Sequence, residues 1–125
     1  MSKQLMELVL PRLARPLYRQ LQRFQAGQWD ENQFTRGFEA LLQRQHNWLT
    51  QRGVSEPRAA LTIHAAVLIL SGPGLRAEAE ESGMPIEQVE FRAVQEAAGD
   101  VARNYGVNER RVTNIISSIL AHYGG

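Results

Sequence analysis

Apolar residues recur every three or four positions along most of this chain, which is the spacing of amphipathic helices. Pro11 and Pro16 fall early in the first such segment. Because proline disrupts a helix interior, we expect the main helix to begin between them and to end at Gly27, with residues 3–10 as a separate turn or short helix. The predicted inward stripe is Leu10, Leu13, Leu17, Leu21 and Phe24.

The second segment carries the clearest local signals for the start of a helix. Asp30 can cap it with Gln33 three residues later, and Trp29 can pack on Phe34 as a hydrophobic staple. Gly53 supplies a left-handed stop. The predicted inward stripe is Phe34, Phe38, Leu41, Leu42, Gln45, Trp48 and Leu49.

A third helix is predicted after Ser55-Glu56-Pro57, because proline is favourable in a first turn. From Arg58 to Leu70 this helix is apolar on nearly all sides, so other helices must surround it and we expect it at the centre of the domain. Its most apolar run, residues 59–70, contains Thr62 and His64 and is too short to cross a bilayer.

The remaining segments complete an all-α prediction. Residues 71–74 (Ser-Gly-Pro-Gly) indicate a loop, followed by a short acidic helix from Leu75 to Ser82 that Gly83 ends. Pro85 opens a long helix with Gly99 inside it. Its predicted inward positions are Phe91, Val94, Ala98, Val101 and Tyr105.

The last helix runs from Glu109 to about His122. Since no segment shows the alternation of a strand, the predicted fold class is all-α, a single domain over residues 1–125 with six or seven helices. Residues 1–72 form the helical core half and residues 73–125 the C-terminal half. The last helix turns inward Val112, Ile115, Ile116, Ile119, Leu120 and Tyr123.

Composition supports one globular domain in a reducing compartment. The 125 residues are 43% hydrophobic and 22% charged, and none is cysteine, which excludes disulfides and thiolate metal sites. The N-terminal apolar run Leu8-Val9-Leu10 is interrupted at once by Pro11, so we expect no secretory signal and a cytoplasmic protein.

The net charge of +1 conceals an asymmetry between the two parts of the chain. Residues 1–53 carry a formal charge of +4 and residues 54–125 a charge of −3. Four arginines of the first part share one helical face, which we interpret as a solvated face in preference to a phosphate-binding stripe. They are Arg12, Arg15, Arg19 and Arg23.

The sequence offers no catalytic or metal-binding constellation. His46, His64 and His122 are far apart and lack the spacing of metal ligands. We interpret His64 as a buried imidazole with one hydrogen-bond partner, and the acidic run at residues 78–81 as an exposed helix start. Gly72-Pro73-Gly74 lacks the lysine of a phosphate loop. We therefore expect no enzyme, no cofactor and no metal.

Residues 101–112 are the most informative stretch of the chain. They indicate a helix, a turn with one glycine, Gly106, and a second helix that Asn108 can cap. Ala102 is small where the two helices would cross, and the apolar side chains after the turn would hold the second helix on the first. Those side chains are Val107, Val112 and Ile115.

On these residues the segment from about 98 to 119 resembles the helix-turn-helix family, in which the second helix enters the DNA major groove. The first helix of such a motif is usually about two turns long. Here the apolar stripe runs back to Phe91, so either Gly99-Asp100 breaks the helix or the motif sits on an unusually long one. A plain helical hairpin has the same spacing.

A weaker echo of the motif, with the same spacing, lies at Ala79, Gly83, Met84 and Val89. Its second helix carries Glu87 and Glu90, so we interpret this copy as structural.

The resemblance assigns roles to the outward face of the last helix. Arg110, Thr113 and Asn114 would contact base edges, Arg111 a phosphate, and Asn108 and Ser117 would flank them. The implied function is sequence-selective DNA binding, as in a small transcriptional regulator, by a homodimer. The alternative is a helical module for binding a protein partner or for oligomerisation, with no nucleic-acid role. For that module the first half offers the aromatic residues Tyr18, Phe24, Trp29 and Trp48.

Overall fold

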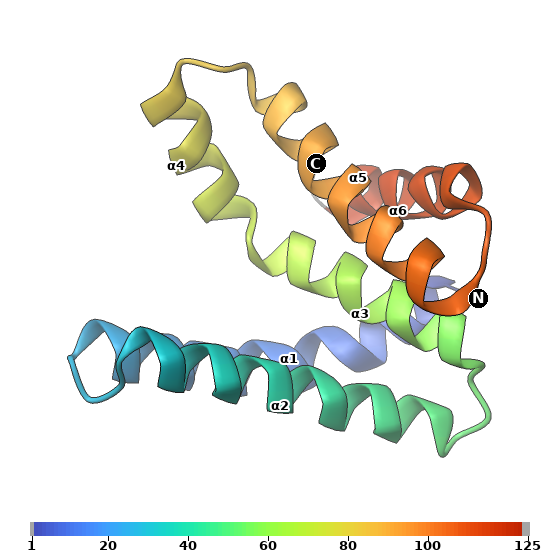
Figure 1. Cartoon of the computed structure of the whole chain (residues 1–125), viewed down its shortest axis with the longest axis horizontal. Helices are drawn as coiled ribbons and strands as arrows, with labels where there is room; N and C mark the ends of the chain where they lie inside the picture. Colours follow the sequence, from blue (N-terminus) through green and yellow to red (C-terminus); the bar gives the residue numbers. More distant parts are fainter. Residues whose placement is uncertain (1, 124–125) are drawn as a thin grey trace.

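The computed structural model describes residues 2–123, with side chains from Gln4 onward, and all the regular structure in this range is helical. This confirms the all-α prediction (Figure 1). The helices are α1 (Ser2–Gln25), α2 (Glu31–Thr50), α3 (Glu56–Leu70), α4 (Gly72–Ser82), α5 (Ile86–Tyr105) and α6 (Glu109–Tyr123).

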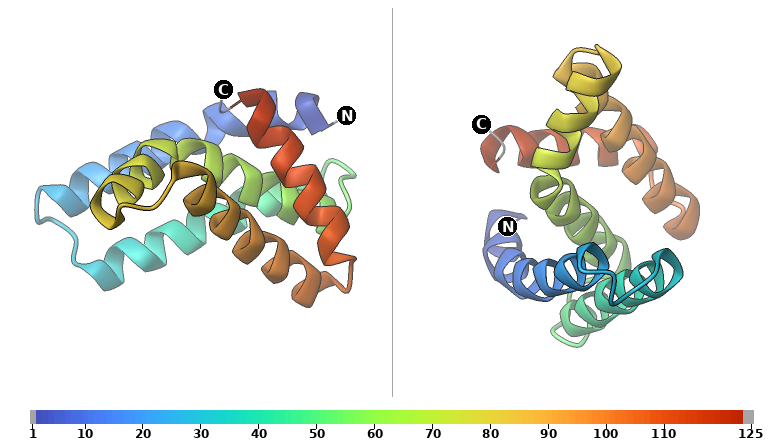
Figure 2. Two further views of the ribbon diagram at one scale, coloured as in Figure 1. Left: turned by 90° about the horizontal axis from the view of Figure 1, so that it is seen from above. Right: turned by 90° about the vertical axis from the view of Figure 1, so that its left-hand side faces the viewer.

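Helix α3 is the centre of the arrangement, as its apolar pattern predicts. Helices α1 and α2 run antiparallel and lie side by side against one flank of α3, while α5 and α6 pack on its other flank (Figure 2). Helix α4 continues from the end of α3 and leads back to α5. Each of the other five helices contacts α3.

Small side chains let α3 take so many neighbours. Ala59, Ala65 and Ala66 have no exposed surface, and their short side chains allow the surrounding helices to approach closely. Larger core residues come from α1, α2, α5 and α6, among them Leu13, Leu41, Val101 and Ile116. No single helix among residues 2–123 is long and apolar enough to cross a membrane; α3 and α4 pass that test only together, as a pair bent by 59°.

Helix α1 runs unbroken through both prolines, so the prediction of a separate element over residues 3–10 is wrong. Met6 and Val9 are completely buried in the common core, and this burial holds the N-terminal turns in line with the rest of α1. Two members of the predicted stripe are also misplaced. Leu21 and Phe24 are 37% and 41% exposed, because α1 extends past the part of it that α3 covers.

The predicted loop at residues 71–74 is also wrong. Ser71 alone separates α3 from α4, and α4 begins at Gly72 with Pro73 in its first turn. An N–H in the first turn of a helix has no helical acceptor, so proline's lack of one costs no hydrogen bond there. Helix α5 continues through Gly99 without a break, so of the two alternatives for this helix the long one is correct. Phe91 on α5 was expected to face inward, but its side chain is 54% exposed.

The capping box and the glycine stop predicted for helix α2 are confirmed. The Asp30 carboxylate accepts from the Gln33 N–H at 2.8 Å, and the Gln33 amide oxygen accepts from the Asp30 N–H at 2.9 Å. Gly53 has a φ of +88° after the end of the helix. Around the start of α2, Trp29 lies against Gly37, and Phe34 pairs with Phe24 at 5.2 Å between ring centroids.

Candidate nucleic-acid interface

A tight turn at Gly106 joins α5 to α6. Its φ of +67° lies in the left-handed region that glycine adopts without steric cost. Its N–H donates to the Ala102 carbonyl at 2.9 Å, which satisfies one of the last carbonyls of α5. The predicted helix–glycine–helix hairpin is therefore present in the structure.

Asn108 caps α6 as predicted. Its Oδ1 accepts from the Arg111 N–H at 2.9 Å, and its carbonyl accepts from the Val112 N–H at 3.1 Å. A cap of this kind contributes about 1 kcal/mol to the stability of a helix. It also fixes the direction in which the first turn of α6 leaves the hairpin.

The two faces of α6 differ sharply in polarity. Val112, Ile116 and Ile119 are buried where α6 packs on α5 and α3. Ile115 and Val107 are half-buried against the same core. The opposite face presents five exposed polar residues, which are Asn108, Arg110, Arg111, Asn114 and Ser117.

Thr113 departs from its predicted place. Its side chain is only half exposed, and its hydroxyl donates to the Glu109 carbonyl at 2.9 Å within α6. The other five predicted site residues lie within the cap and the first three turns of α6. The structure thus brings all six together at one end of the hairpin, with Thr113 at the edge of the exposed group.

Charged neighbours reduce the positive potential of this face. Arg103 forms a salt bridge with Asp100, and the Arg103 guanidinium and the Glu109 carboxylate both lie beside Gly99. Arg110 and Arg111 are exposed and form no ion pair with the described residues. The cations available to a ligand at this end are therefore Arg110 and Arg111, and Glu109 lies next to them in sequence.

The other chemical features noted in the sequence have structural explanations. His64 Nδ1 lies 2.8 Å from the Ala60 carbonyl, which requires Nδ1 to carry the proton and donate. The His46 ring stacks with Tyr105 at 6.2 Å between centroids, linking α2 to the end of α5. Among residues 2–123 no three His, Cys, Asp or Glu side chains converge as metal ligands.

The weaker echo of the hairpin also turns at a glycine with a left-handed backbone. Gly83 has a φ of +72° between α4 and α5, and Ala79 and Val89 are buried on its two sides. Glu87 and Glu90 are exposed on the second helix of this unit. The helix that follows the Gly83 turn therefore presents carboxylates, whereas the helix that follows the Gly106 turn presents arginines.

When it interpreted the arginine face of the first helix as solvated, sequence reasoning set aside a second candidate site, a groove of about 820 Å³ between α1 and α2. Arginines from both helices and both tryptophans of the chain line it. Three members of that arginine face, Arg12, Arg19 and Arg23, line the groove, and the sequence could not show that Arg44 of α2 faces them. No protein-family model, no curated protein and no solved structure matches this chain.

Proposed function

We propose that this protein binds duplex DNA and reads its sequence with the outward face of α6. In this proposal Arg110, Thr113 and Asn114 contact base edges and Arg111 contacts a phosphate, while Asn108 and Ser117 flank them. Arginine pairs with guanine and asparagine with adenine through two hydrogen bonds each. A homodimer would present two such helices to two half-sites.

The observation that carries the proposal is the rigid presentation of this polar face. Three buried residues anchor α6 to the core, Asn108 caps its start, and the exposed side chains come from one end of the helix. The N-terminal end of a helix also favours a phosphate through its free N–H groups and its dipole. The half-buried Thr113 would contribute its methyl group, since its hydroxyl is bonded within α6.

Titration of labelled mixed-sequence duplex DNA at low and at moderate salt tests the proposal. We expect salt-dependent binding by the native protein and a loss of at least about tenfold for the double variant Arg110→Ala/Asn114→Ala, because one good bidentate pair contributes about 1–3 kcal/mol. The matched control is Asn32→Ala/Arg36→Ala, which removes the same two residue types from exposed positions on α2. No binding at low salt, or equal losses in the two double variants, would refute the proposal.

A second candidate function, self-association, is favoured by a groove of apolar and charged side chains beside the C-terminal half of α6. The groove holds about 520 Å³, is lined by Leu68, Ile69 and Leu120, and has the exposed ring of Phe91 at its wall. Arg76 lies on the same lining as Glu87 and Glu90. A second copy related by a two-fold axis would place Phe91 of each subunit in the groove of its partner, and Arg76 of each subunit near the partner's carboxylates.

Analytical ultracentrifugation over a range of protein concentrations tests this second function. We expect a dimer that Phe91→Ser converts to a monomer, because the exchanged rings would supply most of the apolar area at the centre of the interface. The control variant Phe24→Ser removes another exposed phenylalanine from a distant helix and should leave the dimer intact. A native protein that stays monomeric at high concentration contradicts self-association through this groove.

A further inference from the structure

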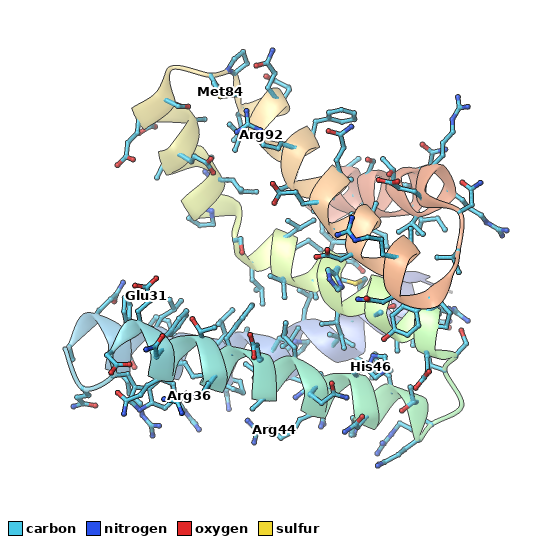
Figure 3. The ribbon with its side chains drawn as sticks, viewed as in Figure 1. Glu31, Arg36, Arg44, His46, Met84 and Arg92 are labelled. Carbon is cyan, nitrogen blue, oxygen red and sulfur yellow. The ribbon has the colours of Figure 1, made fainter. Side chains whose placement is uncertain are left out.

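The groove between α1 and α2 is strongly basic. Its walls include Arg12, Arg19 and Arg23 from α1 and Arg44 from α2, and no aspartate or glutamate is among its lining residues. Figure 3 shows Arg44 on the side of α2 that faces away from α3, whereas His46 points toward α3. The groove therefore opens on a different side of the molecule from the α5–α6 hairpin.

Two of these arginines are held in place by tryptophan rings. The Arg12 guanidinium lies 4.0 Å from the centre of the Trp48 ring, and its Nε donates to the Gln45 amide oxygen at 3.0 Å. Arg23 lies 5.2 Å from the centre of the Trp29 ring. Contacts of this kind orient a guanidinium while leaving its outer N–H groups for a ligand.

The tryptophan faces are occupied and do not form a platform for bases. Trp48 carries a second guanidinium, that of Arg52, at 3.9 Å from its ring centre. The other indole, Trp29, has Arg23 over its ring and packs so closely on Gly37 that a Cβ there would lie 2.7 Å from the ring. A ligand in this groove therefore contacts guanidinium groups and not open aromatic faces.

The floor of the groove has an unfilled hydrogen-bond acceptor. The Gln20 side chain is 92% buried, and its Nε2 donates to the Gly37 carbonyl at 3.0 Å. Its Oε1 has no hydrogen-bond partner among the described residues, which is rare for a buried amide. A water or hydroxyl group entering beneath a ligand would supply the missing donor.

The spread of charge favours a linear ligand over a compact anion. Arg12 and Arg23 are eleven positions apart, which is about 16 Å along a helix. Arg19 lies between them on the same wall and Arg44 lies on the facing wall. Helices that pack against each other have axes about 8–10 Å apart, so the groove between them admits one narrow strand, and a duplex would touch only its rim.

We propose that the α1–α2 groove binds the phosphate backbone of single-stranded nucleic acid without preference for the bases. Guanidinium groups pair with phosphate oxygens through two N–H donors, and this requires no base contact. The site is separate from the DNA-reading face of α6, and its ligand is a single strand. The absence of an open aromatic face predicts nearly equal affinity for oligomers that differ only in their bases.

The test measures fluorescence anisotropy with labelled dT20, dA20 and rU20 over a series of salt concentrations. The variant Arg19→Gln/Arg44→Gln removes one charge from each wall, and Arg15→Gln/Arg36→Gln removes the same charge from the same two helices outside the groove lining. All four side chains are exposed, so we expect both variants to fold, as circular dichroism would verify.

We expect the groove variant to lose at least about tenfold in affinity, and the slope of log K against log salt to become shallower by about 1.4, because each phosphate contact on a single strand contributes about 0.7. We expect the control variant to change affinity by less than about threefold, because the proposal assigns binding to specific groove contacts and not to net charge. Arg110→Ala/Asn114→Ala should leave single-strand binding unchanged, so this proposal and the proposed function can fail separately.

Four results of experiments with oligonucleotides and duplex would overturn the inference. They are the absence of single-strand binding by the native protein, an equal loss in the control and groove variants, a strong preference for one base, and equal competition by a duplex at the same phosphate concentration. Tighter binding of ATP or pyrophosphate than of the oligonucleotides would also overturn it, since it would assign the groove to a compact phosphate ligand.

Discussion

Gly106 and Gly74 show how backbone conformation decides what a glycine contributes. Neither has an atom within 4 Å of the position that a Cβ would occupy, so space is equal at the two sites. Gly106 has a φ of +67° in the turn between α5 and α6, whereas Gly74 lies in the first turns of helix α4. Only Gly106 has a conformation that an L-residue resists.

Alanine substitutions at these two positions should therefore have opposite effects. We expect Gly106→Ala to lower the free energy of unfolding by about 1–2 kcal/mol, since its native φ is left-handed. Gly74→Ala should raise it by up to about 1 kcal/mol, because alanine favours the helix and restricts the unfolded chain. Urea unfolding followed by circular dichroism measures both, and a neutral Gly106→Ala would contradict the assigned turn geometry.

At the scale of the element, α1 is a helix that contains two prolines. Pro11 and Pro16 have no N–H, so the carbonyls of Glu7 and Arg12 accept no helical hydrogen bond from them. The burial of Met6, Val9 and Leu13 in the core offsets this loss. Helix α1 is thus maintained by packing against its neighbours more than by its own helical preference.

Replacing Pro11 with alanine should stabilise the protein. Pro11 is exposed, so the change removes little packing, and it restores one backbone hydrogen bond. Proline in a helix interior costs about 3 kcal/mol relative to alanine, from which the greater freedom of the unfolded chain subtracts up to about 1 kcal/mol. We expect a gain of about 2–3 kcal/mol in urea unfolding. A loss of stability would show that α1 depends on the local geometry that the proline imposes.

The elements that sequence predicts well are those with local causes. The cap at Asp30, the cap at Asn108 and the glycine turns follow from residues a few positions apart, and the structure has all of them. Pro11 was misjudged because the burial of Met6 and Val9 outweighs a local signal, and the segment 71–74 because Pro73 falls in the first turn of α4. The phosphate-binding interpretation of the first-helix arginines was set aside because Arg44 joins them on the facing wall only after α1 and α2 pair.

At the scale of the whole molecule, α3 joins the two halves of the chain into one core. It contacts α1 and α2 on one side and α5 and α6 on the other. Both tryptophans, Trp29 and Trp48, lie in the first half, and Ile116 is completely buried on α6. Tryptophan emission therefore reports on a part of the molecule that does not contain α6.

Ile116→Ala should shift the unfolding transition seen by tryptophan emission as far as the one seen by circular dichroism. We expect both to move by about 2–5 kcal/mol, because a large buried side chain is lost from a core shared by all parts of the fold. The exposed substitution Ser118→Ala should change either transition by less than about 0.5 kcal/mol. If the emission transition stays unchanged while the circular dichroism transition moves, the two halves unfold independently.

Helix α4 has few ties to the rest of the molecule. Ala79 is its single buried residue. Helix α4 contacts α5 and α3. The contacts of α3 with α5 and α6 do not pass through α4. New chain ends opened within α4 should therefore leave two pieces that reassemble through α3, so this protein is suited to circular permutation and to expression as two complementary fragments divided at that helix.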